Sequence, residues 1–111
     1  MKLIDVGTVI ATRELSLPAG KTVTVLIGKP EKFPDTDDYY CPYQILGFGN
    51  QRVRYAGGGD GVQALELVLK MIGTDLYTSK EAQAGELSWH GGKNLGFPVP
   101  DILSDLPPGQ P

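Results

Sequence analysis

The chain has 111 residues, of which 41% are hydrophobic and 21% charged, and its formal net charge is −3. This length allows one small domain that buries roughly 65% of its extended surface, so it can fold without a disulfide or a metal. The acidic balance lacks the basic surface that binding to a phosphate backbone requires, which argues against nucleic acid as a partner. One cysteine excludes an internal disulfide, and one cysteine with one histidine cannot complete a structural zinc site.

The opening sequence, MKLIDVGTVI, does not resemble a signal peptide, because Asp5 and Gly7 interrupt it before any long apolar run. No stretch reaches the ~18 apolar residues of a membrane span. We therefore expect a cytoplasmic protein with no membrane partner and no cofactor.

Residues 8–28 predict a β-hairpin. Residues 8–17 alternate between apolar and polar side chains, residues 22–28 do the same, and the PAGK sequence between them is typical of a tight turn. The predicted core face of the first strand carries Val9, Ala11, Leu15 and Leu17. Arg13 lies in phase with this face, so it either extends to the edge of the sheet or pairs with a carboxylate under a helix.

Two more strands are predicted at residues 39–46 and 51–58, after an exposed loop at 29–38. In the first, Cys41, Tyr43 and Ile45 share the core face, and Pro42 places the strand at a sheet edge or in a bulge. In the second, Val53 and Tyr55 are expected to face the core, which turns Arg52 and Arg54 away from it.

A long helix is predicted to begin after Asp60 and to end near Tyr77 or Thr78. Asp60 suits the N-cap, and Gln63 completes a capping box. Gly73 is expected to weaken the last turns. An apolar stripe recurs at helical spacing at Leu65, Val68, Leu69, Ile72 and Leu76.

The remaining residues predict a short fifth strand near Leu87 and Trp89 and a proline-rich tail at 93–111, in which residues 100–106 have the pattern of one helical turn. We thus expect a single α+β domain at residues 1–92. Its architecture is a four- or five-stranded antiparallel sheet with one long helix packed on one face.

Cys41 is the candidate nucleophile, and His90, the one histidine of the chain, could act as its base if the two meet in space, with Asn94 to orient the imidazole. Against this site, Cys41 alternates in phase with Tyr43 and Ile45, as a buried structural cysteine does. The glycine run before the helix, AGGGDG, matches no phosphate-binding spacing, and the carboxylate of Asp60 would repel an anion. The residues therefore favour a protein without catalytic residues, although an enzyme is not excluded.

The sheet face away from the helix is the predicted contact surface. Tyr and Arg are enriched where proteins bind one another, and the same mixture is also what an ordinary solvated sheet presents. The residues that we assign to partner binding are Tyr40, Gln44, Arg52, Arg54, Trp89 and His90.

The segments IATREL, IGKP, DYYCPYQI and VRYAGGGDGVQALELVLKMIG resemble a family of small uncharacterised bacterial proteins, over residues 8 to 90. The resemblance implies a compact, cytosolic bacterial domain and brings no assigned activity or catalytic residue. Some small acidic bacterial α+β domains act as immunity proteins that block toxins, and this analogy is one of fold alone.

The leading hypothesis is a non-enzymatic module that binds another protein, in the manner of an immunity protein or inhibitor, whose acidic charge favours a basic partner. The alternative is a small-molecule-binding protein or enzyme with a pocket near Cys41 and His90. A third possibility is a homodimer that pairs edge to edge through the strand at 39–46.

Overall fold

The computed structural model describes residues 1–100, so the helical turn predicted at residues 100–106 lies outside the described residues. The sheet consists of β1 (Val9–Ser16), β2 (Thr22–Gly28), β3 (Glu31–Lys32), β4 (Tyr39–Leu46) and β5 (Arg54–Gly58). A 3-10 turn, η1 (Pro18–Gly20), joins the first two strands, and the helices are α1 (Gly61–Tyr77) and α2 (Lys80–Gln83). All strand pairs are antiparallel. The predicted α+β class, with one long helix on a five-stranded sheet, is confirmed.

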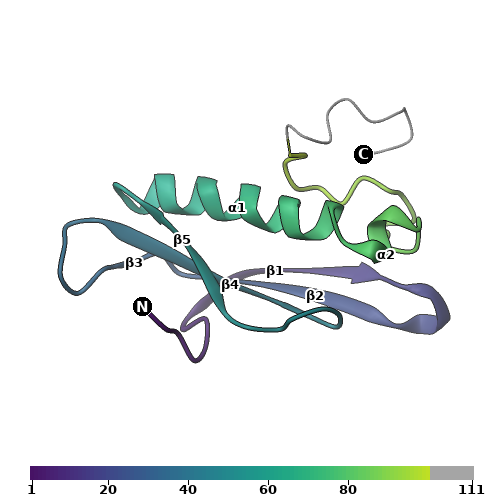
Figure 1. Cartoon of the computed structure of the whole chain (residues 1–111), viewed down its shortest axis with the longest axis horizontal. Helices are drawn as coiled ribbons and strands as arrows, with labels where there is room; N and C mark the ends of the chain where they lie inside the picture. Colours follow the sequence, from purple (N-terminus) through teal and green to yellow (C-terminus); the bar gives the residue numbers. More distant parts are fainter. Residues whose placement is uncertain (101–111) are drawn as a thin grey trace.

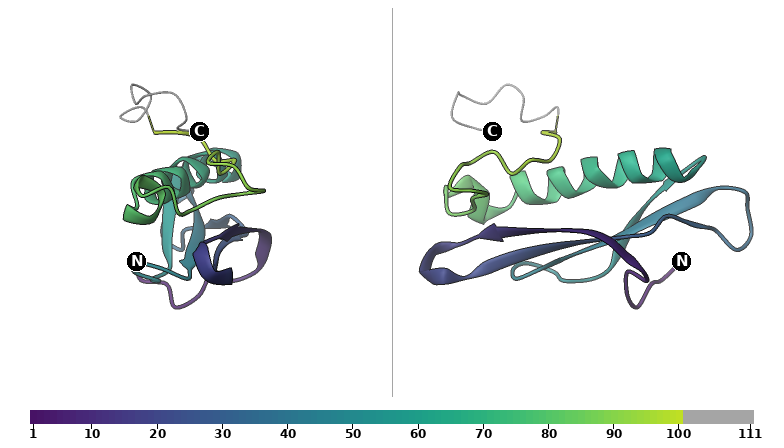
Figure 2. Two further views of the ribbon diagram at one scale, coloured as in Figure 1. Left: turned by 90° about the vertical axis from the view of Figure 1, so that its right-hand side faces the viewer. Right: turned by 180° about the vertical axis from the view of Figure 1, so that it is seen from behind.

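Helix α1 lies across one face of the sheet, and the chain begins on the opposite face (Figures 1 and 2). The α1 cap is the predicted one, since Asp60 Oδ1 accepts a hydrogen bond from Gln63 N and Gln63 Oε1 accepts one from Gly59 N. The helix packs on β4 and β5 and has few contacts with β1 or β2. Its fully buried face includes Ala64, Val68, Ile72 and Leu76, whereas Leu65 and Leu69 are only partly buried.

Strand β4 is the centre of the sheet, not its edge. Its residues Tyr43–Leu46 pair with β2, Tyr39 and Tyr40 pair with β3, and β5 pairs along its other side. Pro42 therefore lies between the β2 and β3 segments, where the ladder is interrupted. Of the two alternatives predicted at Pro42, the sheet edge is wrong because β4 is paired on both sides, and the missing N–H falls instead where the pairing passes from β2 to β3.

The register of β5 corrects a second prediction. Arg54 lies opposite Tyr43 and Ala56 lies opposite Cys41, so both share the helix side of the sheet with the buried β4 side chains. Tyr55 accordingly points to the other face, and the prediction that Val53 and Tyr55 face the helix is wrong. The physical reason is space: a Cβ on Gly58 would lie 2.5 Å from Ala64 N, so small residues are needed where β5 meets α1.

Strand β1 is only partly covered. Leu15 is buried and Leu17 half-buried, as predicted, but Val9 and Ala11 are exposed. The register with β2 shifts between Val9 and Ala11, which leaves Ile10 without a partner and marks a β-bulge. Because α1 does not reach this end of β1, the apolar pattern of residues 9–11 has no core to face.

Residues 86–99, here called the return segment, close the core over the other end of β1. Leu87, Leu95 and Phe97 are buried in the main core, although the sequence analysis assigned residues from 93 onward to a tail outside the domain. No strand forms at 86–90; instead Ser88 bridges to Ser16, and the fifth strand of the sheet is β3. The buried hydroxyl of Tyr77 accepts a hydrogen bond from Leu95 N at 2.9 Å.

Arg13 holds the return segment to the sheet. Its guanidinium lies 3.9 Å from the centroid of the Trp89 ring and 4.8 Å from that of Phe97, and it donates a hydrogen bond to the Leu95 carbonyl at 3.2 Å. Such cation–π contacts stabilise by about 0.5–2 kcal/mol, more where water is excluded. Arg13 thus binds aromatic rings and a carbonyl, rather than the carboxylate that the sequence suggested as one possibility.

The return segment also crosses α1 at Gly73. A Cβ on Gly73 would lie 2.0 Å from the Pro98 carbonyl oxygen, a backbone atom that cannot rotate away. The glycine that we expected to weaken the helix is therefore the residue that lets the chain pack over it.

We predict that Gly73→Ala lowers the free energy of unfolding by about 1–3 kcal/mol, because the new methyl group forces the return segment away from the helix. Chemical denaturation monitored by circular dichroism measures this change. Gly61→Ala is the matched control in the same helix, since its Cβ would meet only Pro30 and Tyr39 at ordinary contact distances. Equal stability of Gly73→Ala and the parent would contradict the role assigned to this contact.

Candidate binding surfaces

The six residues predicted to bind a partner lie in three different places. Gln44, Arg52 and Arg54 line one cavity. Tyr40 packs on the open face of the sheet against Phe33 and Tyr55, with ring centroids 5.1 and 5.8 Å away. Trp89 and His90 belong to the return segment, where the two rings lie 4.7 Å apart. The structure therefore brings together three of the six and provides no single surface that contains them all.

Cys41 and His90 do not form a catalytic pair. Cys41 is 0% exposed within the core, and its thiol donates to the Gly28 carbonyl at 3.3 Å. Burial raises the pKa of the Cys41 thiol from 9.0 to about 11, which keeps it protonated at neutral pH. His90 is exposed, in a left-handed backbone conformation with φ of 51°. The geometry favours the buried structural cysteine of the two interpretations left open by the sequence.

We predict that the thiol of folded Cys41 reacts with iodoacetamide at pH 8 at least about a hundredfold more slowly than free cysteine, because burial and the raised pKa both oppose thiolate formation. Mass spectrometry over time measures the modification, and the same reaction in denaturant is the control, where alkylation should be fast. Rapid alkylation of the folded protein would restore Cys41 as a candidate nucleophile.

Tyr43, Asp75 and Arg54 form a polar network between β4, α1 and β5. The Tyr43 hydroxyl donates to Asp75 Oδ2 at 2.5 Å, and Arg54 donates to the same oxygen at 2.9 Å. Burial is the main cause that raises the pKa of Tyr43 above its ordinary value; the hydrogen bond to Asp75 and its negative charge add to it, and Arg54 opposes it. Arg54 thus points toward the helix side, contrary to prediction, and secures the edge strand to α1.

The unfolding free energy should fall as pH rises above about 9. Cys41 and Tyr43 have raised pKa values in the folded state, so the unfolded chain loses these protons first. The stability is therefore intact below pH 9 and declines between pH 9 and the folded pKa values. Denaturation midpoints across this range test the prediction, and Tyr43→Phe should show a shallower decline than the parent. A stability that rises with pH in this range would contradict it.

A cavity of about 560 Å³ adjoins the polar network, between the turn at 48–50 and the end of α1. Its charged side chains, Arg54, Asp75, Lys80 and Glu81, include both signs. Its hydroxyls are engaged within the helices: Ser79 Oγ donates to the Leu76 carbonyl and Thr78 Oγ1 to that of Thr74. This cavity thus has no excess of one charge, and its hydroxyls are already bonded within the chain.

The larger cavity, of about 790 Å³, lies at the β5 edge, and here it is called the Arg52 cavity. One wall is the N-terminal segment, Met1–Ile4, and the others are the turn leading into β5 and the side chain of Met71 from α1. The turn is fixed by Gln51, whose Oε1 accepts from Gly47 N and whose carbonyl accepts from Gln44 Nε2. A hydrogen-bonded turn therefore carries Arg52 in the lining of this cavity.

The outer edge of β1 is open. Ser16 exchanges backbone hydrogen bonds with Ser88 on the side away from β2, and backbone groups alternate sides along an antiparallel strand. The N–H and C=O of Glu14 and Thr12 therefore also point outward. No residue from 1 to 100 outside the β1–β2 pair bonds to them. Next to them, Val9 and Ile10 are 44% and 48% exposed.

Within residues 1–100, no group of three or more His, Cys, Asp or Glu side chains is placed to hold a metal ion. Over the same residues, no helix has the length and apolar character that crossing a membrane requires.

These observations define a small α+β domain with an open strand edge at β1 and a cationic cavity, and no assembled catalytic group among its described residues. The chain belongs to the family described as a domain of unknown function, DUF6968, whose model matches residues 11–99. No curated protein and no solved structure gave a significant match. The match includes the return segment up to Val99, in agreement with its place in the core.

Two features of these surfaces escaped the sequence analysis. The N-terminal segment packs on the open face, where Val6 is buried against Gly28 and Pro42; the apolar Leu3, Ile4 and Val6 were its only signal. The apolar, uncharged residues 9–11 indicate an open edge at β1 only once the order of the strands is known, because that order places β1 at the end of the sheet.

Proposed function

We propose that this chain is a non-enzymatic protein-binding module of the bacterial cytoplasm, which binds an extended segment of a partner protein along the free edge of β1. The observation that carries the proposal is the outward-facing, unbonded backbone of Thr12 and Glu14. A free strand edge is a template to which another strand adds by main-chain hydrogen bonds.

The side chains around this edge define the partner segment. Val9 and Ile10 offer exposed apolar surface beside the open backbone groups, so they favour a segment with apolar side chains. Glu14 is exposed on the same strand and favours a lysine or arginine opposite it. A basic, partly apolar strand is thus the chemistry that complements the edge.

The usual protections of an edge strand are weak here. Natural edges are blocked by prolines, lysines or bulges. Residues 9–14 contain no proline or lysine, Arg13 turns inward onto Trp89, and the protections that remain are the bulge at Ile10 and the charge of Glu14. The opposite edge, β5, is shorter and contains Gly57 and Gly58, which give a partner fewer side chains to contact.

An inhibitor of the immunity type is one form that such a module takes, because a strand laid on a partner can block the partner's own surface. The overall charge of −3 supports a basic partner, which electrostatic steering would bring in quickly. The alternative of a pocket at Cys41 and His90 has no support in the geometry. A homodimer through β4 has none either, since β4 is flanked on both sides; self-pairing through β1 is a competing outcome of the test.

We predict that short peptides selected from a random library on the immobilised protein contain alternating apolar residues and at least one lysine or arginine. Their affinity should fall about tenfold in Thr12→Pro, because proline removes an outward N–H and its hydrogen bond to the peptide. Calorimetry measures the affinity. Thr12→Ala is the matched control, since it shortens the side chain and keeps the N–H.

Hydrogen exchange distinguishes the edge from the rest of the surface. In the free protein the amides of Thr12 and Glu14 should exchange faster than those of Arg13 and Leu15, which point toward β2, and bound peptide should slow them. Peptides that bind Thr12→Pro as tightly as the parent would overturn the proposal. So would light scattering that gives twice the 11.9 kDa monomer mass together with slow exchange at Thr12 in the free protein, which would identify a second copy as the occupant.

A further inference from the structure

We propose that the Arg52 cavity is a binding site for an organic anion with an apolar body, such as a medium-chain carboxylate. The cavity is separate from the β1 edge: none of its lining residues belongs to β1. The inference therefore does not depend on the proposed protein-binding function.

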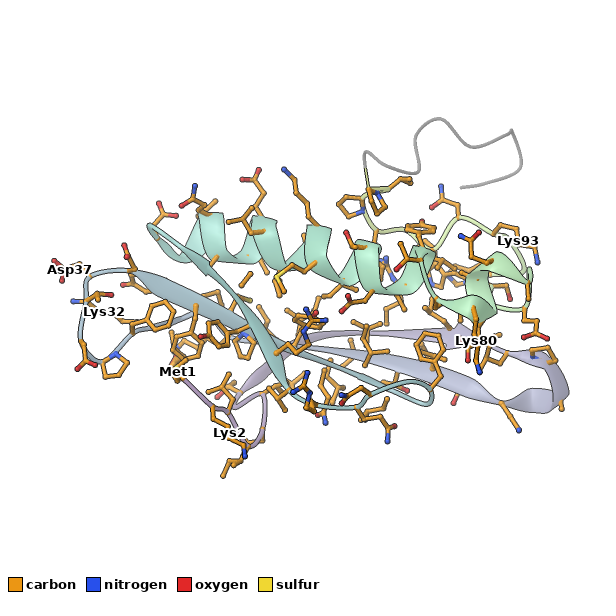
Figure 3. All side chains as sticks on the ribbon, in the orientation of Figure 1. Met1, Lys2, Lys32, Asp37, Lys80 and Lys93 are labelled. Carbon is orange, nitrogen blue, oxygen red and sulfur yellow. The ribbon has the colours of Figure 1, made fainter. Side chains whose placement is uncertain are left out.

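Charge is distributed unevenly in this cavity. The chain carries 13 acidic and 10 basic side chains, yet the cavity is lined by Lys2, Arg52 and Arg54 and by no carboxylate. Figure 3 shows Lys2 on the side of the sheet opposite α1. An anion in the cavity would meet positive charge from the N-terminal segment on one wall and from the β5 side on the other.

Two of the three cations are available to a ligand. Within residues 1–100, neither Lys2 nor Arg52 forms an ion pair, and the Arg52 side chain makes no hydrogen bond. Arg54 donates to Asp75 through one nitrogen and is partly neutralised by it. The planar guanidinium of Arg52 matches a carboxylate with two parallel hydrogen bonds, so Arg52 is the expected primary contact and Lys2 the second.

Apart from the amides of Gln44 and Gln51, the rest of the lining is mainly apolar and indicates what the anion is attached to. Leu3, Val53, Met71 and the ring of Tyr55 contribute hydrocarbon surface. Met71 projects from α1, and a methionine side chain adapts its shape to an apolar guest. The cavity volume of about 790 Å³ falls within the range of roughly 300–1,000 Å³ found for small-molecule sites. An inorganic anion would leave this apolar surface unused.

The turn that carries Arg52 is held by hydrogen bonds within the chain. Gln51 bonds to Gly47 and Gln44, and Arg52 N donates to Asn50 Oδ1 at 2.9 Å. Binding therefore requires ordering of the Arg52 and Lys2 side chains but not of the loop, which lowers its entropic cost.

Titration with decanoate, followed by calorimetry and by amide chemical shifts, tests the proposal. Decanoate should bind saturably with one site per chain, with shifts at residues 2–4, 44 and 51–55. Decanol, which has the same chain without the charge, and acetate, which has the charge without the chain, should each bind at least tenfold more weakly, because each loses one half of the recognition.

Variants locate the site. Arg52→Gln and Lys2→Gln should each weaken decanoate binding about tenfold or more, since a hydrogen bond to a charged group is lost. Lys21→Gln removes the same charge from the hairpin turn and should leave the affinity unchanged. Circular dichroism confirms that each variant is folded, because Lys2 and Arg52 are exposed and outside the core.

Equal affinity for decanoate and decanol would overturn the proposal, because recognition would then be apolar alone. Unchanged affinity in Arg52→Gln, shifts confined to the cavity beside Asp75, or no detectable binding would also overturn it. Peptide binding at β1 is measured separately, so failure of one proposal leaves the other intact.

Discussion

The structure depends on one constraint: α1 alone does not cover the helix-side face of the sheet, so the return segment must bury the rest of that face. Helix α1 packs over β4 and β5, and the return segment completes the cover by crossing α1 at Gly73, where its Pro98 carbonyl takes the place of a side chain. Leu95 and Phe97 are then buried in the same core as Leu15. Arg13 fixes this arrangement from the sheet side through Trp89 and the Leu95 carbonyl.

The two candidate surfaces lie where this cover ends. Within residues 1–100, the return segment makes backbone hydrogen bonds to β1 at Ser16 alone, so the backbone at Thr12 and Glu14 remains open. On the other side, β5 is short and secured to α1 by the Arg54–Asp75 pair, and a hollow is left between that edge and the N-terminal segment. Both candidate surfaces, the β1 edge and the Arg52 cavity, thus lie where neither α1 nor the return segment covers the sheet.

The local pattern of apolar and polar residues predicted most of the helices and strands. It predicted which side chains face the core only in strands whose alternating apolar residues are all buried. Val23, Val25 and Ile27, like Cys41, Tyr43 and Ile45, alternate and are buried as expected. The orientation of β5 could not be predicted in this way, because the residues that face α1 are Ala56 and Gly58, which are too small to give a clear apolar pattern. Val53, which has the stronger apolar character, precedes the strand. The return segment was missed because its buried residues are separated by glycines and a proline that resemble a tail, and the candidate cavity because its walls come from distant parts of the sequence.

The N-terminal segment has a further consequence. The family model matches residues 11–99, which include all of the sheet except the first two residues of β1, together with α1 and the return segment, whereas the Met1–Ile4 wall of the Arg52 cavity precedes that range. The scaffold and one side of the cavity are therefore separable parts of the chain. Because residues 1–4 belong to no strand, replacing them would alter the shape and charge of the hollow without changing the pairing of the sheet.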